Sequence, residues 1–205
     1  DPQRASEGLV YELTDKDTGP HRFRVGLGLR TDFSGQGAFS LAISHNQHWF
    51  NESGAEWRNR IRLGERQGLY SEIFQPLDRR NDSFLATYVD HELRHVELFD
   101  GAGNPFAEFT RSSTRVGVDY GWTLGRDAQL GDARVGLTAA RLSASPDIVA
   151  APFAAGPTQR WREYGLRASL VADQLDYANF PQSGYRFHTE LQLGQRHSLG
   201  QRDRF

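Results

Sequence analysis

The chain of 205 residues contains no cysteine, so it can form neither a disulfide framework nor a thiolate metal site. Lysine occurs once, at Lys16, and 23 of the 24 basic residues are therefore arginine (24 − 1 = 23). No run approaches the roughly 18 consecutive apolar residues of a membrane-spanning helix, which excludes such a helix. The formal net charge of −2 gives no reason to expect nucleic-acid binding.

Methionine is also absent, and the chain opens on Asp1 without a signal peptide, so we expect a mature protein or a fragment. Glycine is abundant, with 21 residues, and aromatic residues make up 12% of the chain. No segment of useful length has the apolar spacing of an amphipathic helix. These features together predict an all-β protein.

Apolar and polar residues alternate along most of the chain, as they do in strands whose successive side chains face opposite sides. The clearest segment is 21–33, where Phe23, Val25, Leu27 and Leu29 share one face and arginine and glycine occupy the other. The same alternation predicts strands at 39–44, 57–63, 69–74, 85–94, 115–124, 134–139, 163–170 and 185–193. Turn-forming residues separate most of these segments, which gives about nine antiparallel strands.

Two architectures fit this alternation, because the apolar face can point into a core or outward into lipid. A soluble β-sandwich binding module would have the first arrangement and a transmembrane β-barrel the second. The apolar sets are about four residues long, which suits a thin hydrocarbon band crossed by tilted strands. Tryptophans also lie at strand ends, where Trp49, Trp57 and Trp122 would form one rim of an aromatic girdle. The membrane barrel is therefore favoured.

Each face of the predicted barrel supplies candidate residues. The lipid-facing or girdle set is Leu27, Leu29, Trp49, Trp57, Trp122 and Tyr185. The lumen set is Arg58, Arg60, Arg62, Glu72, Asp90, Glu92, Asp119 and Glu190. We expect the lumen charges to pair, since an unpaired buried arginine is costly, and the alternative is a substrate path lined by arginine.

One local motif suggests metal chemistry, because His91-Glu92-Leu93-Arg94-His95 matches the H-E-x-x-H signature of zinc proteases. That chemistry needs a helix, whereas this segment alternates like a strand. Residues four apart in a strand lie roughly 13 Å apart, too far for two zinc bonds of about 2 Å. We therefore expect His91 and His95 to be a chance match, with no metal and no cofactor.

A second local motif, Asp100-Gly101-Ala102, is similar to the Asp-Gly motif that holds the catalytic aspartate of patatin-type lipases. The chain contains no G-x-S-x-G nucleophile elbow, so this aspartate has no serine to activate. We expect no catalytic residue and no enzymatic activity in this chain.

The segment 173–185 resembles the D-x-L-D-x-x-x-F-P-x-x-G-Y turn of the bacterial surface-antigen outer-membrane barrel superfamily. The matching residues are Asp173, Asp176, Phe180, Pro181 and Gly184. The segments 24–29, 54–59 and 71–77 are most like the C-terminal barrel of patatin-like phospholipases secreted by the fifth pathway. This resemblance implies a sixteen-stranded barrel, of which residues 21–205 form the N-terminal portion after a lead-in, residues 1–20, from a periplasmic domain.

The function implied by the resemblance is that of a membrane anchor and translocator in the bacterial outer membrane. The expected partners are outer-membrane lipids, the barrel assembly machinery and a second copy of the chain, and no nucleic acid is expected. The alternative within the superfamily is the barrel of an outer-membrane assembly or transport factor. In the implied topology, the turns at 51–54, 125–132 and 179–184 are periplasmic, and the loop at 144–157 is extracellular.

Overall fold

The computed structural model describes residues 19–31, 37–101, 103–125, 130–149, 156–173, 184–198 and 201–204. Every regular element within these ranges is a β-strand, and all the strand pairs are antiparallel. The prediction of an all-β antiparallel fold is therefore confirmed. In the same ranges, no helix has the length and apolarity needed to cross a membrane.

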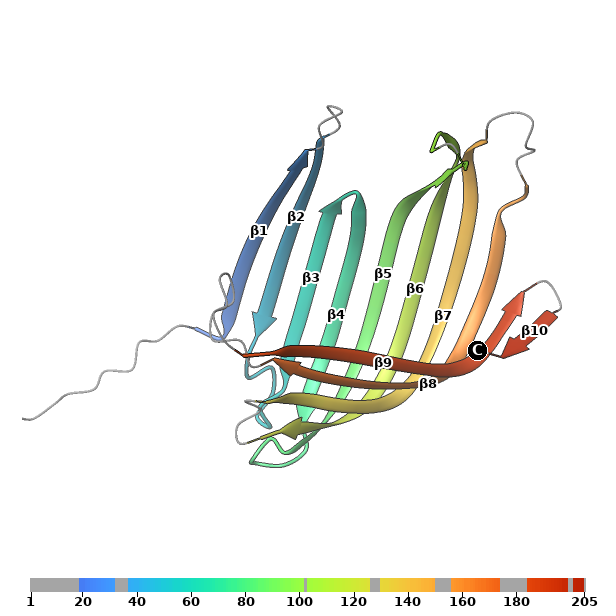
Figure 1. The fold of residues 1–205 in the computed structure, drawn as a ribbon. Helices are drawn as coiled ribbons and strands as arrows, with labels where there is room; N and C mark the ends of the chain where they lie inside the picture. The colour runs from blue at the N-terminus through green and yellow to red at the C-terminus, as the bar shows by residue number, and fades with distance from the viewer. Residues whose placement is uncertain are drawn as a thin grey trace, which may run out of the picture.

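Ten strands form one sheet in which each strand pairs with its neighbours in the sequence (Figure 1). They are β1 His21–Thr31, β2 Gly37–Gln47, β3 Glu56–Gly64, β4 Arg66–Pro76, β5 Ser83–Phe99, β6 Pro105–Leu124, β7 Gly131–Val149, β8 Gln159–Asp173, β9 Arg186–Ser198 and β10 Gln201–Arg204. The first nine correspond to the nine predicted segments, and β10 was not predicted. The lead-in expected at 1–20 lies outside the described residues except for its last two.

The sheet is curved and open, with β1 and β10 at its two edges (Figure 1). The curvature brings distant strands together across the concave face. Arg134 of β7, for example, reaches Glu72 of β4, from which it is separated by β5 and β6. The described strands do not close into a barrel.

Burial is inverted relative to that of a soluble protein, because charged residues are hidden and large apolar residues are exposed. Glu72 and Asp119 on the concave face have exposed fractions of 2% and 0%. Leu29 and Leu137 on the convex face have exposed fractions of 80% and 60%. Phe84 and Ala86, two of the few buried apolar residues, lie on the concave side with the charges.

Strands β5, β6 and β7 have 17, 20 and 19 residues and extend well past the predicted segments. The segment predicted at 85–94 is a strand from Ser83 to Phe99, for instance. The extra length carries polar residues on both faces, as in Arg111-Ser112-Ser113-Thr114 of β6. Alternation of hydrophobicity cannot mark a stretch whose two faces are both polar, which explains why residues 111–114 were not predicted as strand.

Candidate functional site

The convex face of the sheet carries a continuous surface of exposed apolar side chains, which we call the apolar belt. Its exposed members include Val25, Leu27, Leu29, Ile61, Leu63, Leu69, Val89, Val116, Val118, Leu137, Leu166, Leu191 and Leu193. Exposed apolar surface on this scale is unusual on a protein in water and marks a surface that something else covers. Leu27 and Leu29, the predicted lipid-facing residues, belong to the belt and are 69% and 80% exposed.

The belt runs obliquely across the strands. One row of directly paired residues is Val25, Ile43, Ile61, Leu69, His91, Thr114, Arg141, Arg162 and His197. A second row, read from the other side of the sheet, is Leu193, Leu166, Leu137, Val118, Thr87, Ile73, Trp57, Gln47 and His21. Each row starts apolar and ends polar, so the belt is tilted against the hydrogen-bonding direction. Strands tilted to a barrel axis produce this relationship when the belt lies perpendicular to that axis.

The concave face holds the buried charges in two groups and one separate pair, and Glu72 is the centre of the first group. Its carboxylate accepts hydrogen bonds from Arg58 Nη1 at 3.1 Å, Arg134 Nη1 at 2.7 Å and the Tyr70 hydroxyl at 2.7 Å. The Glu72 side chain is only 3% exposed, so two cations and a hydroxyl compensate one buried anion. Arg134 also donates to Asp132 at 2.8 Å.

The second group centres on Asp119 of β6, whose side chain is 1% exposed. Arg167 of β8 donates to Asp119 Oδ2 at 2.5 Å and to Glu190 Oε2 at 2.9 Å. Arg196 of β9 pairs separately with Glu163 at 2.6 Å. Arginine presents several donors in a fixed plane, which lets one side chain join carboxylates on two strands.

The structure brings together four of the eight predicted lumen residues in these two groups, namely Arg58, Glu72, Asp119 and Glu190. Arg94 and Glu92 form a looser contact of 4.0 Å. Arg62 lies close enough to Asp90 to interact with it electrostatically. Arg60 makes no ion pair with any described residue.

The two arginines that bridge most of this network, Arg134 and Arg167, were not among the predicted lumen residues. Both occupy polar positions of alternating segments, so the sequence carried the signal that they share the face of Glu72 and Asp119. Their partners lie 62 and 48 positions away in the chain, a relationship that only the strand register determines.

Aromatic rings on the concave face lie over glycines of the neighbouring strand. Phe84 faces Gly121 and Tyr88 faces Gly117 in register, and a Cβ at either glycine would collide with the ring. The Arg134 guanidinium lies 5.1 Å from the centre of the Phe84 ring, within reach of a cation–π interaction. The concave face is therefore packed and not merely lined with charge.

The H-E-x-x-H segment lies in the middle of β5, so the helix that its zinc chemistry needs is not formed. His91 and His95 both lie on the convex face, and Nδ1 of each contacts the hydroxyl of a threonine on β6, at 2.8 and 3.1 Å respectively. Glu92 points to the opposite face from the two histidines, because neighbouring residues in a strand alternate.

The predicted girdle residues gather toward the ends of their strands. Trp49 adopts a positive φ of 55° in the β2–β3 turn and is 74% exposed. Trp57 and Trp122 are 37% and 46% exposed, and Tyr185 is 58% exposed just before β9.

Little of the family turn motif lies within the described residues. Asp173 is the last residue of β8 and pairs with Arg186, and Gly184 has a positive φ of 103°, which suits glycine. Asp176, Phe180 and Pro181 lie outside the described ranges. Comparison with known proteins adds nothing further: no family model, no curated protein and no solved structure matches the chain.

Proposed function

We propose that this chain forms part of a transmembrane β-barrel in the bacterial outer membrane and serves as the anchor and translocator of a patatin-like phospholipase. The observation that carries the membrane part of the proposal is the inversion of burial. Exposed leucine, isoleucine and valine cover the convex face, whereas Glu72 and Asp119 are buried on the concave face. Lipid would remove the belt from water, and a polar lumen would hold the charges.

Strand lengths support the same proposal. Strands β1 to β4 have 11, 11, 9 and 11 residues, which matches the roughly 9–11 residues that a tilted strand needs to cross a bilayer. The open edges of the sheet cannot face hydrocarbon. Each backbone N–H or C=O group left without a hydrogen bond there would cost on the order of several kcal/mol. Further strands, from the same protein or from a second copy, would close the barrel.

The phospholipase part of the proposal rests on the resemblance of segments 24–29, 54–59 and 71–77 to the barrels of such enzymes. The barrel of an outer-membrane assembly or transport factor would have the same belt. The reading frame upstream of Asp1 separates the two. A G-x-S-x-G domain there supports the phospholipase anchor, and several tandem periplasmic domains would replace it with the assembly factor.

The membrane proposal can be tested by site-directed spin labelling, for which the absence of cysteine is an advantage. Leu137→Cys places a label on the belt, and the matched control Thr138→Cys places one on the opposite face of the same strand. In lipid vesicles, we expect the label at 137 to be relaxed by dissolved oxygen and shielded from a water-soluble nickel chelate. The label at 138 should show the reverse preference.

The soluble β-sandwich makes a different prediction for the same pair of labels. There a protein layer would cover residue 137, so oxygen and the nickel chelate would both be excluded. A chain that stays monomeric without detergent and gives that result would overturn the proposal.

A further inference from the structure

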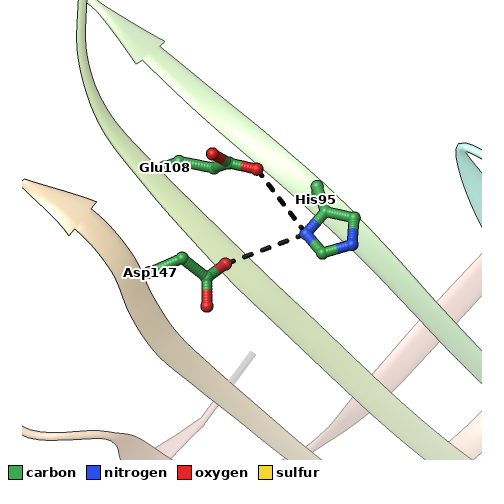
Figure 2. A group of neighbouring side chains, drawn as sticks. All are labelled: His95, Glu108 and Asp147. Atoms are coloured by element: carbon green, nitrogen blue, oxygen red, sulfur yellow. Dashed lines mark ion pairs between the residues drawn. The ribbon is translucent and has the colours of Figure 1, made fainter.

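Three potential metal ligands meet on the convex face where β5, β6 and β7 extend past the apolar belt. They are His95 of β5, Glu108 of β6 and Asp147 of β7 (Figure 2). His95 Nδ1 lies 3.7 Å from Glu108 Oε1 and 3.8 Å from Asp147 Oδ2, as the dashed lines in Figure 2 mark. The three ligand atoms all lie within 4.8 Å of one another.

An irregularity in the strand pairing brings Asp147 into this group. Thr110 and Phe109 of β6 pair with Ser145 and Pro146, but the next residue, Glu108, pairs with Ile148. Asp147 is thus the extra residue of a β-bulge, a feature that re-aims a side chain. The Thr110 hydroxyl donates to Asp147 Oδ2 at 2.6 Å and so fixes the carboxylate beside the imidazole.

The surroundings of the three ligands are rich in negative charge, which a bound cation would compensate. Glu97 of β5 lies directly opposite Glu108 of β6 in the register, and like charges in that position destabilise a sheet. Asp147 adds a third carboxylate, and Glu97 makes no ion pair with any of the described residues. His95 is half exposed and is the ion-pair partner that Glu108 and Asp147 share among the described residues.

We infer that His95, Glu108 and Asp147 form a binding site for a divalent transition metal ion, with Zn²⁺ as the best match. One imidazole and two carboxylates are zinc ligands, whereas Ca²⁺ and Mg²⁺ prefer oxygen alone. Zinc bonds of about 2.0–2.2 Å in a tetrahedron place ligand atoms about 3.3–3.6 Å apart. The two separations from His95 Nδ1, 3.7 and 3.8 Å, need only a small contraction, and the carboxylate oxygens of Glu108 and Asp147 lie within 4.8 Å of each other before any ion is bound.

The ion would link three strands outside the apolar belt and leave one coordination position open to solvent. Its effect would be to hold together the extensions of β5, β6 and β7 on their convex face, where the residues at this level are polar. The site does not depend on the proposed membrane function, since the ligands lie beyond the belt.

Isothermal titration calorimetry of the full chain with zinc chloride tests the inference, in detergent or in buffer alone if the chain is soluble. We expect one zinc ion per chain. His95→Gln and Asp147→Asn should each weaken zinc binding by at least about tenfold. Replacing even a residue that only hydrogen-bonds to a metal ligand typically lowers metal affinity by about that factor. Zinc should also slow proteolysis of the wild-type extensions and leave those of His95→Gln unchanged.

His91→Gln is the matched control, because His91 lies on the same strand and face and contacts a threonine hydroxyl in the same way. Its direct neighbours in the row are Leu69 and Thr114, neither of which is a carboxylate. Zinc affinity should therefore be unchanged in His91→Gln. Equal affinity in the wild type and both ligand variants, or an equal loss in His91→Gln, would show that the three residues form only an ion-paired cluster.

Discussion

Arg167 joins two carboxylates that come from different strands, with Nη1 on Asp119 Oδ2 at 2.5 Å and Nη2 on Glu190 Oε2 at 2.9 Å. Asp119 is fully buried, and its second oxygen, Oδ1, has no hydrogen-bond partner among the described residues. The negative charge of Asp119 is thus compensated chiefly from one side. Removal of Arg167 would leave a buried anion without its main partner, whereas removal of an exposed arginine would not.

We predict that Arg167→Leu lowers the free energy of unfolding by about 3 kcal/mol, the lower end of the cost of breaking a buried ion pair. The control is Arg60→Leu on the same concave face, because Arg60 is exposed and has no ion pair among the described residues. That substitution should change the free energy by less than about 0.5 kcal/mol. Guanidinium unfolding in detergent measures both, and equal effects of the two substitutions would contradict the pairing.

Gly121 lies under the ring of Phe84, which is 1% exposed, and a side chain at this position would collide with the ring. We predict that Gly121→Val costs about 1–3 kcal/mol through overpacking. Gly26→Val is the matched control, since Gly26 is a strand glycine with nothing within 4 Å of the position that a Cβ would occupy. There, valine should be neutral or slightly stabilising because it favours strands. The two unfolding midpoints in guanidinium should therefore move apart, and a shared shift would count against this packing.

Much of the fold could be predicted because alternation is a local signal. Phe23, Val25 and Leu27 are marked as one face by their own spacing, and the structure puts them on the convex side. The ends of β5 to β7 could not be predicted, because polar residues such as His95, Glu97 and Glu108 take the convex face there, whereas that face is apolar in the belt. The contact of Glu72 with Arg134 could not be predicted either, since alternation gives the face of a residue but not its register against distant strands.

Asp78 organises the turn between β4 and β5. Its carboxylate accepts hydrogen bonds from the backbone N–H groups of Arg80, Asp82 and Ser83 at 3.0, 2.9 and 2.8 Å, and from the Ser83 hydroxyl at 2.8 Å. These bonds, the one from the Asp82 N–H foremost, lower the pKa of Asp78 below its ordinary value. The folded turn therefore favours the ionised carboxylate.

A depressed pKa in the folded state stabilises the protein above the pKa of the unfolded state, and this contribution is lost as the pH falls through the folded-state value. We predict that Asp78→Asn lowers the stability of the fold at neutral pH. The variant should also lack the decrease in stability that the wild type shows as the pH falls through the folded-state pKa of Asp78. Asp82→Asn, whose side chain makes no hydrogen bond with a described residue, should leave the pH profile of the unfolding midpoint unchanged. Parallel profiles for the wild type and Asp78→Asn would contradict the assigned role.

The cluster of His95, Glu108 and Asp147 shows why a site can escape sequence analysis. His95 first drew notice through its spacing to His91, but the structure pairs it with residues of two other strands. Strand register brings Glu108 opposite, and a bulge turns Asp147 toward the imidazole. Neither the register nor the bulge leaves a signal in local spacing.

Leu137 offers the sharpest stability test of whether lipid or water covers the convex face. It is 60% exposed and is paired with Val118 and Leu166 in the apolar belt. An exposed residue of a soluble protein tolerates substitution within about 0.5 kcal/mol. An arginine at mid-bilayer on a barrel costs about 2–4 kcal/mol. We therefore predict that Leu137→Arg destabilises the protein in lipid vesicles by about 2–4 kcal/mol.

The control is Ser112→Arg on β6. Ser112 lies on the same convex face of the sheet as Leu137 but beyond the belt, where an arginine would reach the polar interface or water. The cost of this substitution should be about 0–1 kcal/mol. Denaturant unfolding in vesicles gives both values under one condition. A difference between the variants means that the belt lies in hydrocarbon and the row at Ser112 does not. Two equally small effects would mean that water covers both positions, and the exposed leucines would then need another explanation.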